Sequence, residues 1–345
     1  MSDKRSHMFN IDPQHHFDTQ RLAVAQSAAI RRTAATEVAR GLDNVFFASA
    51  GGVALLTYPA ARLLQQRSSL PVFIERAAEL AATENANLGP RSLVVLCSVS
   101  GTTKEAVAMM KAAQARGAHV LTFTGTPETP LATLSDINIA TPAADDTSSE
   151  TYLIQTLVLA LALMEARGEL SGLDEILTDL ALLPSALVAA KQEFEPRAQE
   201  LAAALVGRDR PLMFTGAGGA WYEAWYFAMC ILEEMQWIWT RPIHASDFFH
   251  GTFELVEKDV AVVLLTGEDA SRPLAERVKA FVPGTGGDLF VIDTAEFELA
   301  GIGATTRALV SPVVLATVLE RLSVHVEALT GHPLTTRRYY KRMEY

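Results

Sequence analysis

Short runs of consecutive apolar residues alternate along the chain with longer segments whose apolar residues recur every three or four positions. The short runs predict buried strands, and the longer segments predict helices. In the first half we expect strands over 45–48, 93–97 and 119–124, a short apolar run at 71–73, and helices over 21–42, 55–66, 104–116 and 152–167. This alternation is typical of a parallel sheet that helices cover on both faces.

The second half repeats this plan, with strands predicted over 212–215, 260–266 and 288–292 and a helix over 310–328. A glycine pair follows the first strand of each half, at Gly51 and at Gly218, and 218 − 51 is 167. The next loops begin at corresponding points, Ser98 and Thr266, and 266 − 98 is 168. Two landmarks with nearly the same offset predict an internal duplication.

These patterns divide the chain into five parts. We expect an N-terminal arm of residues 1–20, a first α/β domain over 21–170, a connection over 171–200 that can itself be helical, a second α/β domain over 201–330, and a basic C-terminal tail over 331–345. The length of 345 residues is sufficient for two domains that each bury a core.

Composition narrows the class of protein. Hydrophobic residues make up 49% and charged residues 20% of the chain, and the mean hydropathy is +0.17, values typical of a folded globular protein. The net charge of −11 disfavours nucleic acid or an anionic membrane as a partner. It does not disfavour a small phosphorylated ligand, because local hydrogen-bond donors decide such binding.

Cysteine content and hydropathy indicate the cytoplasm. Cys97 and Cys230 are the two cysteines, which is too few for a disulfide framework. No apolar stretch reaches the roughly 18 uninterrupted residues that span a bilayer, and the first twenty residues lack the apolar region of a signal peptide. The histidines at 7, 15 and 16 have no metal-ligand spacing, so we expect neither a metal nor a cofactor.

Hydroxyl side chains follow the second long strand of the first half. Ser98, Ser100 and Thr103 stand where this strand passes into a helix, a place that offers hydroxyls, backbone N–H groups and the positive end of a helix dipole to a phosphate. The alternative is that Thr103 is a helix N-cap and that the serines are ordinary turn residues. Gly51 and Gly52 either let the backbone approach a ligand closely or form a tight turn.

The corresponding loop of the second half has a different chemistry. It lacks the paired hydroxyls of Ser98 and Ser100 and carries Glu268 and Asp269 instead. Carboxylates repel phosphate, so this copy is not expected to bind it. We therefore predict one phosphate site per chain.

Two titratable residues stand out in the segment 221–255. A helix is predicted over 221–235 and is expected to end before Pro242, which cannot continue it. Glu234 lies among apolar residues of this helix, where desolvation would raise the pKa of a carboxylate, and His250 follows sixteen positions later. Such a pair suits acid–base catalysis near neutral pH. The alternative is a surface acid and a structural loop histidine.

Several of these segments resemble a known family. The run Glu-Met-Gln-Trp from Glu234, the sixteen-residue step to His250, the segment Phe-Phe-His-Gly-x-Phe-Glu over 248–254 and the C-terminal ending resemble the SIS (sugar isomerase) proteins, in particular the fructosamine-6-phosphate deglycases. The isomerase domain of glucosamine-6-phosphate synthase is a more distant match. The resemblance implies two tandem flavodoxin-like SIS domains and a homodimer with shared active sites.

The resemblance also implies roles for individual residues. Glu234 would be the acid–base group at the substrate carbon, and His250 would assist at the sugar ring or the amine. Ser98, Ser100 and Thr103 match the family's Ser-x-Ser-Gly-x-Thr phosphate loop. Four further residues are implied to contact the substrate: Gly51, Gly52, Ser148 and Lys341, the last in a tail that folds over the sugar. Val53 stands where family members often carry serine.

The activity that the resemblance implies is hydrolysis of a fructose-amino acid 6-phosphate to glucose 6-phosphate and a free amino acid. The synthase reaction is disfavoured because the sequence contains no glutaminase domain. A ketose–aldose isomerase or an amino-sugar-phosphate deaminase is the alternative among enzymes. A sugar-phosphate sensor is the alternative of another class, but it would have no use for the Glu234 and His250 pair.

Overall fold

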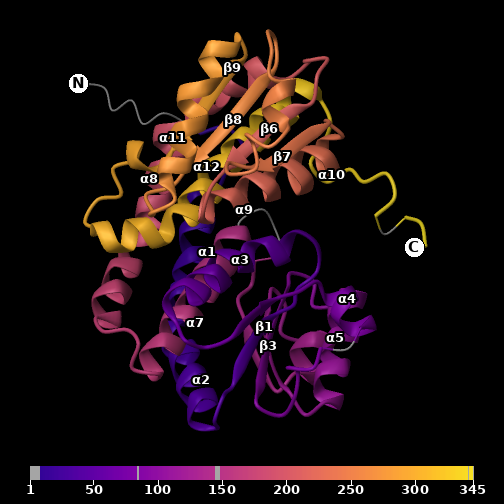
Figure 1. Ribbon diagram of the computed structural model, residues 1–345, viewed down its shortest axis with the longest axis vertical. Coiled ribbons are helices and arrows are strands. Elements are labelled where there is room, and N and C mark those ends of the chain that lie inside the picture. The colour runs from indigo at the N-terminus through magenta and orange to yellow at the C-terminus, as the bar shows by residue number, and fades with distance from the viewer. Residues whose placement is uncertain (1–7, 84, 144–147, 341, 345) are drawn as a thin grey trace. The chain divides into compact units, whose positions relative to one another are not determined.

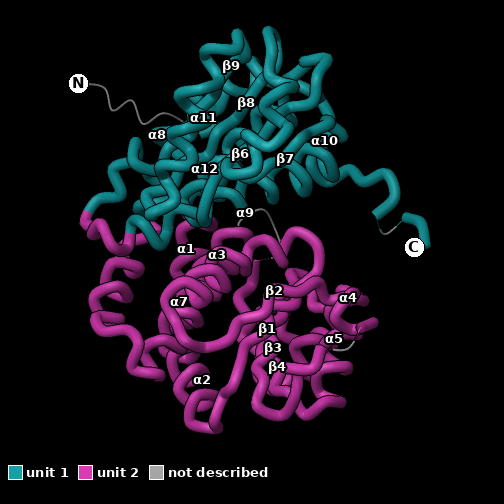
Figure 2. Tube along the Cα trace, in the orientation of Figure 1, with its two compact units in different colours: residues 1–13, 185–300, 307–345 teal, residues 14–184, 301–306 magenta. Residues whose placement is uncertain are grey.

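The strands form two separate parallel sheets in the computed structural model, which describes residues 8–83, 85–143, 148–340 and 342–344. One sheet contains β1 (Asn44–Phe47), β2 (Val72–Ile74), β3 (Ser92–Ser98), β4 (His119–Thr124) and β5 (Ile137–Ala140). The other contains β6 (Leu212–Gly216), β7 (Thr240–His244), β8 (Ala261–Thr266) and β9 (Asp288–Asp293). Figure 2 shows the two compact units: unit 1 comprises residues 1–13, 185–300 and 307–345, and unit 2 comprises 14–184 and 301–306.

The two sheets share one strand order. The first sheet has the order β2-β1-β3-β4-β5, which is the flavodoxin-like order, and the second has the order β7-β6-β8-β9, which repeats its first four positions. All strand pairs in both sheets are parallel. The predicted flavodoxin-like α/β class is therefore confirmed, and the repeated order is what an internal duplication produces.

Helices cover both faces of the unit 2 sheet, as Figure 1 shows. The helices of this unit are α1 (Pro13–Ala25), α2 (Ser27–Ala39), α3 (Gly51–Arg67), α4 (Ala77–Ala82), α5 (Lys104–Ala115), α6 (Pro130–Leu134) and α7 (Ser148–Ala166). Helix α7 is buried from its first residue through Met164 and packs against α2 and α3. The strand β3 is buried along its whole length, which explains its continuous apolar sequence.

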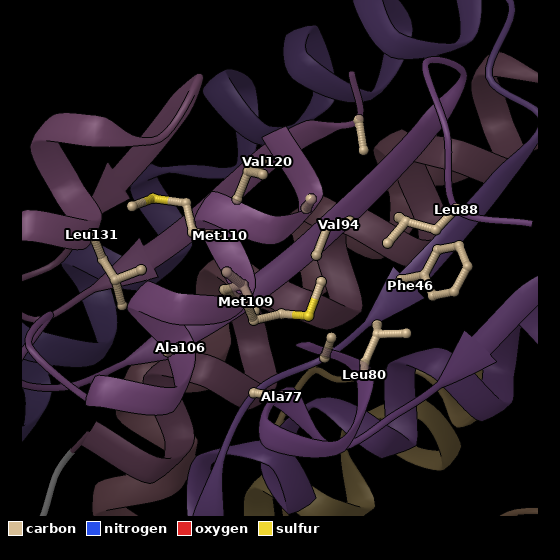
Figure 3. Packing of buried hydrophobic residues seen from close by; sticks show 14 residues of the cluster. Phe46, Ala77, Leu80, Leu88, Val94, Ala106, Met109, Met110, Val120 and Leu131 are labelled. Carbon is tan, nitrogen blue, oxygen red and sulfur yellow. The ribbon is translucent and has the colours of Figure 1, made fainter. Parts of the chain in front are cut away.

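The opposite face of this sheet packs against α4, α5 and α6 (Figure 3). Met109 and Met110 of α5 are fully buried between Val94 of β3 and Leu131 of α6 in this cluster. Because helix and sheet bury these residues together, the loop that connects β3 to α5 is fixed at both ends. That loop contains Ser98, Ser100 and Thr103.

Unit 1 has its own core beneath β6 and β8. Its helices are α9 (Gly219–Tyr226), a π-helical segment (Phe227–Glu233), α10 (Glu234–Gln236), α11 (Arg272–Phe281) and α12 (Ala304–Thr330), with short 3₁₀ segments at Thr252–Leu255, Val282–Thr285 and Thr294–Glu296. Val262 and Leu264 of β8 pack with Val278 of α11 and with Phe248, which lies beyond β7. The core thus holds the turn that carries His250.

Two boundaries differ from those expected. Residues 13–20, assigned to an arm, begin α1, whose buried residues are mostly polar and therefore give no apolar pattern. The predicted connection is helical as expected, since α8 spans Leu173–Leu205, and the division between the units falls inside it. Residues 301–306 group with unit 2 rather than with the second domain.

Helix α12 is long and apolar enough to cross a membrane by length and composition alone, but 83% of its most apolar window is buried inside the protein. A single helix of this kind is weak support for a membrane span, because the core helices of globular proteins share its composition. Its buried valines and leucines, Val314 and Leu319 among them, mark α12 as a core helix.

Candidate active site

In unit 2, the glycine pair and the hydroxyl loop lie at one edge of the sheet. Gly51 follows β1 and the loop 98–103 follows β3, and these two strands are parallel neighbours. The strand order reverses between β1 and β3, and ligands of flavodoxin-like sheets bind at this switch point, beyond the carboxyl ends of the strands. The topology therefore brings together two of the predicted substrate-contacting segments.

The hydroxyl loop holds its own side chains in place. Ser98 Oγ accepts a hydrogen bond from the Gly101 N–H at 3.0 Å and lies 3.0 Å from Thr103 Oγ1. Ser100 Oγ accepts from the N–H and the hydroxyl of Thr102 at 3.3 and 3.0 Å. Thr103 occupies the N-cap position of α5 but, within this described segment, its side chain forms no capping hydrogen bond. The backbone N–H groups at the positive, N-terminal end of α5 are thus not capped by Thr103 and can donate to another hydrogen-bond acceptor.

The backbone conformation at the start of α3 favours a glycine. Gly51 has a φ of +61°, which disfavours side-chain-bearing residues. A Cβ at this position would have no heavy atom of the described residues within 4 Å. The space beside the turn is therefore open, so both predicted roles of the glycine, the turn and the close approach of a ligand, are compatible with the structure.

Ser148 is the first residue of α7 and is 8% exposed. The residues before it, 144–147, lie outside the described part of the chain, and so does Thr147 of the predicted capping segment. The structure thus places Ser148 at a helix N-terminus, and its contact with a sugar stays a prediction.

In unit 1, the loop at the corresponding switch point is filled by the chain itself. Asp269 accepts hydrogen bonds from the backbone N–H of Ser271 at 2.7 Å and of Gly219 at 3.4 Å. A Cβ at Gly218 would lie 2.5 Å from Asp269 Oδ2. The carboxylate therefore occupies the place at the start of α9 where an anion would otherwise bind.

Glu234 lies at the end of an unusual helical segment. Seven residues of π-helix, Phe227–Glu233, separate α9 from α10, which begins at Glu234. Wide turns of this kind are rare in proteins and frequently mark functional sites. Trp237 then adopts a left-handed conformation with a φ of +56° and ends the helix. The helix thus ends before Pro242, as predicted.

The surroundings of Glu234 differ from those predicted. Its side chain is 42% exposed rather than enclosed by apolar residues, and its Oε1 accepts a hydrogen bond from Arg337 Nε at 2.8 Å. Of its neighbours in the sequence, Leu232 and Gln236 are buried, whereas Glu233 and Glu234 are both exposed. Burial, and after it the negative charge of Glu234, raises the pKa of the Cys230 thiol, so Cys230 stays protonated.

His250 is exposed at the end of a turn that the core anchors. The residues after the predicted helix form β7, an edge strand that contains Pro242, a strand that the sequence did not predict. Phe248 is fully buried, and its N–H donates to the His244 carbonyl at 2.9 Å. The His250 N–H donates to the Asp247 carbonyl at 2.9 Å. The aromatic residue thus fixes the turn and leaves the imidazole on the surface.

Glu234 and His250 do not meet within one chain. The two side chains, both described, form no hydrogen bond or ion pair with each other. Glu234 precedes the amino end of β7, and His250 follows its carboxyl end. A five-residue strand is about 16 Å long. The chain thus runs the length of β7 between the two residues, and no hydrogen bond or ion pair joins their side chains.

The C-terminal tail contacts the segment that carries Glu234, and Figure 1 shows the tail leaving the unit near α10. Gln236 Nε2 donates to the His332 carbonyl at 2.6 Å, and the His332 ring lies 4.2 Å from that of Trp237. The Arg338 guanidinium lies 4.1 Å from the centre of the Trp237 ring. The tail is therefore not simply a solvated segment. Lys341, the predicted substrate contact, lies outside the described residues.

The described residues form no metal-binding cluster, and both cysteines are buried free thiols. Among the described residues there is no group of three or more His, Cys, Asp or Glu side chains placed to hold a metal ion. Cys97 is a buried free thiol whose pKa is raised by burial.

The chain has two parallel sheets with the same strand order, and a loop rich in hydroxyl side chains lies at the switch point of the first sheet. These features define a class of two-domain α/β proteins, and SIS proteins belong to this class. The SIS domain model matches residues 42–166. The chain is 32% identical to the fructosamine deglycase FrlB of Bacillus subtilis, over 88% of this chain and 93% of that protein. The chain therefore belongs to the SIS-domain family that includes this deglycase, and the predicted resemblance is confirmed.

Two further relatives agree with this assignment. The fructoselysine 6-phosphate deglycase of Escherichia coli is 26% identical over 88% of this chain and 87% of its own length. A crystal structure from Salmonella typhimurium, described as that of a phosphosugar isomerase, has a TM-score of 0.86 at 27% identity and covers 94% of this chain and 97% of its own.

Proposed function

We propose that this protein is a fructosamine-6-phosphate deglycase, which hydrolyses a fructose-amino acid 6-phosphate to glucose 6-phosphate and a free amino acid. One observation carries the proposal: 32% identity to the fructosamine deglycase of B. subtilis extends over 88% of this chain and 93% of that protein. The relative from E. coli, which acts on fructoselysine 6-phosphate by its name, supports the same substrate class.

The chemistry assigned to the two titratable residues is proton transfer. After the sugar ring opens with the help of His250, Glu234 removes a proton from C1 and a proton returns at C2, which converts the ketosamine to the imine of glucose 6-phosphate. Water then adds to C1, the C–N bond breaks, and the amine leaves with its electron pair and a proton. Positioned proton transfer of this kind contributes about 10²- to 10⁴-fold to the rate.

The phosphate of the substrate is assigned to unit 2. Ser98, Ser100 and Thr103 offer hydroxyls beside the N-terminus of α5, and the turn at Gly51 and Gly52 offers backbone N–H groups. These segments lie at the same edge of the sheet. Two further contacts, from Ser148 and from Lys341 of the tail, are part of the proposal.

We further propose a homodimer in which each active site takes Glu234 from one subunit and His250 from the other. The placement of these residues at opposite ends of β7 supports this sharing. Glu234→Gln and His250→Asn are each expected to be inactive. Co-folding an equal mixture of the two variants is expected to restore part of the activity, because some hybrid dimers contain one intact site. An inactive mixture of hybrid dimers would contradict a shared site.

The protein is proposed to work in the cytoplasm on a small molecule, with neither nucleic acid nor membrane as a partner. The buried free cysteines, Cys97 and Cys230, suit a reducing compartment, and the net charge of −11 disfavours polyanions.

Product analysis tests the proposal directly. The purified protein is incubated with a fructose-amino acid 6-phosphate, and glucose 6-phosphate and free amine are measured over time. We expect both products in equal amounts. Conversion of fructose 6-phosphate to an aldose without any amine release would favour an isomerase, and tight binding without turnover would favour a sensor.

A further inference from the structure

The Arg337 guanidinium lies directly on the carboxylate of Glu234. Its Nε donates to Glu234 Oε1 at 2.8 Å, while its Nη1 donates to the carbonyl oxygens of Leu334 and Thr336 at 2.5 and 3.0 Å. The Arg337 side chain is 19% exposed. The hydrogen bonds to the tail carbonyls thus hold the guanidinium in contact with Glu234, the residue proposed to transfer the proton.

This ion pair opposes the proposed reaction. Arg337 Nε occupies Glu234 Oε1, so this oxygen is not free to accept a proton from the substrate while the pairing lasts. If Glu234 removes a proton from C1, the pairing has to loosen when substrate is bound. A second anion can loosen it by accepting the hydrogen bonds of Arg337 in place of Glu234.

The proposed substrate can carry such an anion next to its reacting carbon. In a conjugate formed through the α-amine of an amino acid, the nitrogen on C1 is bonded to Cα, and Cα carries the carboxylate. Three bonds therefore separate C1 from the carboxylate carbon. A group that contacts Glu234 while Glu234 reaches C1 is within range of this carboxylate, whereas the 6-phosphate lies at the other end of the sugar.

We propose that Arg337 binds the α-carboxylate of the departing amino acid and that this exchange of partners frees Glu234 for proton transfer. The inference rests on the proposed deglycase function and adds a substrate class to it: conjugates in which the amine that is attached to the sugar lies α to a carboxylate. Conjugates of simple amines, and of lysine through its ε-amine, lack a carboxylate at this distance and react more slowly.

The tail stays attached to the Glu234 segment through contacts that do not involve Arg337. Gln236 accepts a hydrogen bond from Thr330 Oγ1 at 2.7 Å and donates to the His332 carbonyl, and Arg338 lies over the ring of Trp237. Arg337 can therefore change partners while the tail remains in place. Arg342, an exposed arginine of the same tail, supplies a matched control, because its replacement removes the same charge without removing one of these contacts.

The test compares two synthetic substrates that differ in the carboxylate. Fructose-glycine 6-phosphate carries it, and the corresponding ethylamine conjugate has a methyl group in its place. The wild-type protein is expected to show a kcat/KM about 10- to 100-fold higher for the glycine conjugate, the range for a hydrogen bond between charged groups. Arg337→Gln is expected to reduce this preference to within about 3-fold, whereas Arg342→Gln keeps it.

The outcomes separate this inference from the proposed function. Equal turnover of both conjugates by the wild type, or a preference that survives in Arg337→Gln, overturns the role of Arg337 and leaves the deglycase function standing. Failure of the wild type to release amine from either conjugate overturns both. Arg337→Lys, which keeps the charge without the planar pair of donors, is expected to retain part of the preference, and it replaces Arg337→Gln should that variant fail to fold.

Lysine conjugates provide a second, independent readout. Attachment of fructose 6-phosphate through the α-amine keeps the carboxylate three bonds from C1, and attachment through the ε-amine moves it four bonds farther away. The wild type is expected to favour the α-linked isomer, and Arg337→Gln is expected to lose this preference. A wild-type preference for the ε-linked isomer would overturn the inference.

Discussion

The loop after β3 in unit 2 and the loop after β8 in unit 1 hold the same position in sheets of the same strand order, yet only the first has an open glycine turn beside it. Beside the first, a Cβ on Gly51 would meet no atom of the described residues within 4 Å. Beside the second, the carboxylate of Asp269 lies against Gly218 and accepts the N–H of Ser271. A carboxylate of the chain has thus taken the position that an anionic ligand can occupy in the other copy.

This difference indicates how the duplicated units divide the work. The second loop is fixed further by Glu268, which receives hydrogen bonds from Arg307 at 2.8 and 2.9 Å, and so needs no ligand to hold its shape. Unit 1 instead carries Glu234 and His250 on segments that have no counterpart among the predicted site residues of unit 2. Under the proposed function, phosphate binding and proton transfer therefore belong to different units.

The largest expected effect is a loss of turnover without a loss of binding, on replacement of Glu234. Glu234→Gln keeps the size of the side chain but removes the base, so kcat is expected to fall by about 10²- to 10⁴-fold while glucose 6-phosphate binds as before. Steady-state kinetics and calorimetric titration measure the two quantities. An equal loss of turnover and of binding would mean that Glu234 is structural. Glu233→Gln, which changes the neighbouring exposed acid, is the matched control.

The next effect concerns the open loop. Ser100→Ala removes a hydroxyl assigned to the phosphate and is expected to weaken glucose 6-phosphate binding about 10- to 100-fold, with a smaller change in kcat. Thr102→Ala removes the hydroxyl that donates to Ser100 Oγ and is expected to weaken binding less than Ser100→Ala does, because Ser100 keeps its own hydroxyl. Equal weakening in both variants would mean that the loop acts only through its conformation.

The filled loop is expected to contribute to stability rather than to binding. Asp269→Ala leaves the N–H groups of Ser271 and Gly219 without their acceptor and is expected to lower the free energy of unfolding by about 1–2 kcal/mol. Asp209→Ala, at an exposed position of the same unit, controls for the change of charge. Denaturant unfolding and kcat/KM are measured on the same variants. A loss of substrate affinity in Asp269→Ala would contradict the proposal that phosphate binds only to unit 2.

A smaller effect depends on pH. Burial raises the pKa of Asp293, but hydrogen bonds from Arg272 and the Ala295 N–H, with the charge of Arg272, outweigh it and hold the pKa below the usual value of 3.8. Because the folded pKa is the lower one, this stabilisation is present above about pH 4 and is lost as the pH falls further. Asp293→Asn is expected to cost about 1 kcal/mol at pH 7 and progressively less below pH 4. If the difference in the free energy of unfolding between Asp293→Asn and the wild type did not vary with pH, the stabilising role of the Asp293 carboxylate would be contradicted.

The central strands could be predicted from sequence because they are buried on both faces. The strand β3 is buried at every position and reads as an uninterrupted apolar run. The strands β5 and β7 were missed because they lie at sheet edges, where burial is partial, and β7 also contains Pro242. Helix α1 was missed because its buried positions include His16, Thr19 and Gln20.

The candidate site was predictable as a set of residues but not as an arrangement. The hydroxyl loop and the two titratable residues follow from motifs that are short in sequence. The pairing of Glu234 with Arg337 joins positions 103 residues apart and has no local signal. The exposure of Glu234 likewise depends on the π-helical segment before it, which rotates the following residues away from the positions that a regular helix would give.

The number of glucose 6-phosphate molecules that bind to each chain tests the central claim most directly. Isothermal titration calorimetry is expected to give one site per chain in the wild type, a weakened site in Ser100→Ala, and an unchanged site in Asp269→Ala. Two sites per chain, or a single site that is insensitive to Ser100 and lost with Asp269, would contradict the assignment of phosphate to the open loop of unit 2.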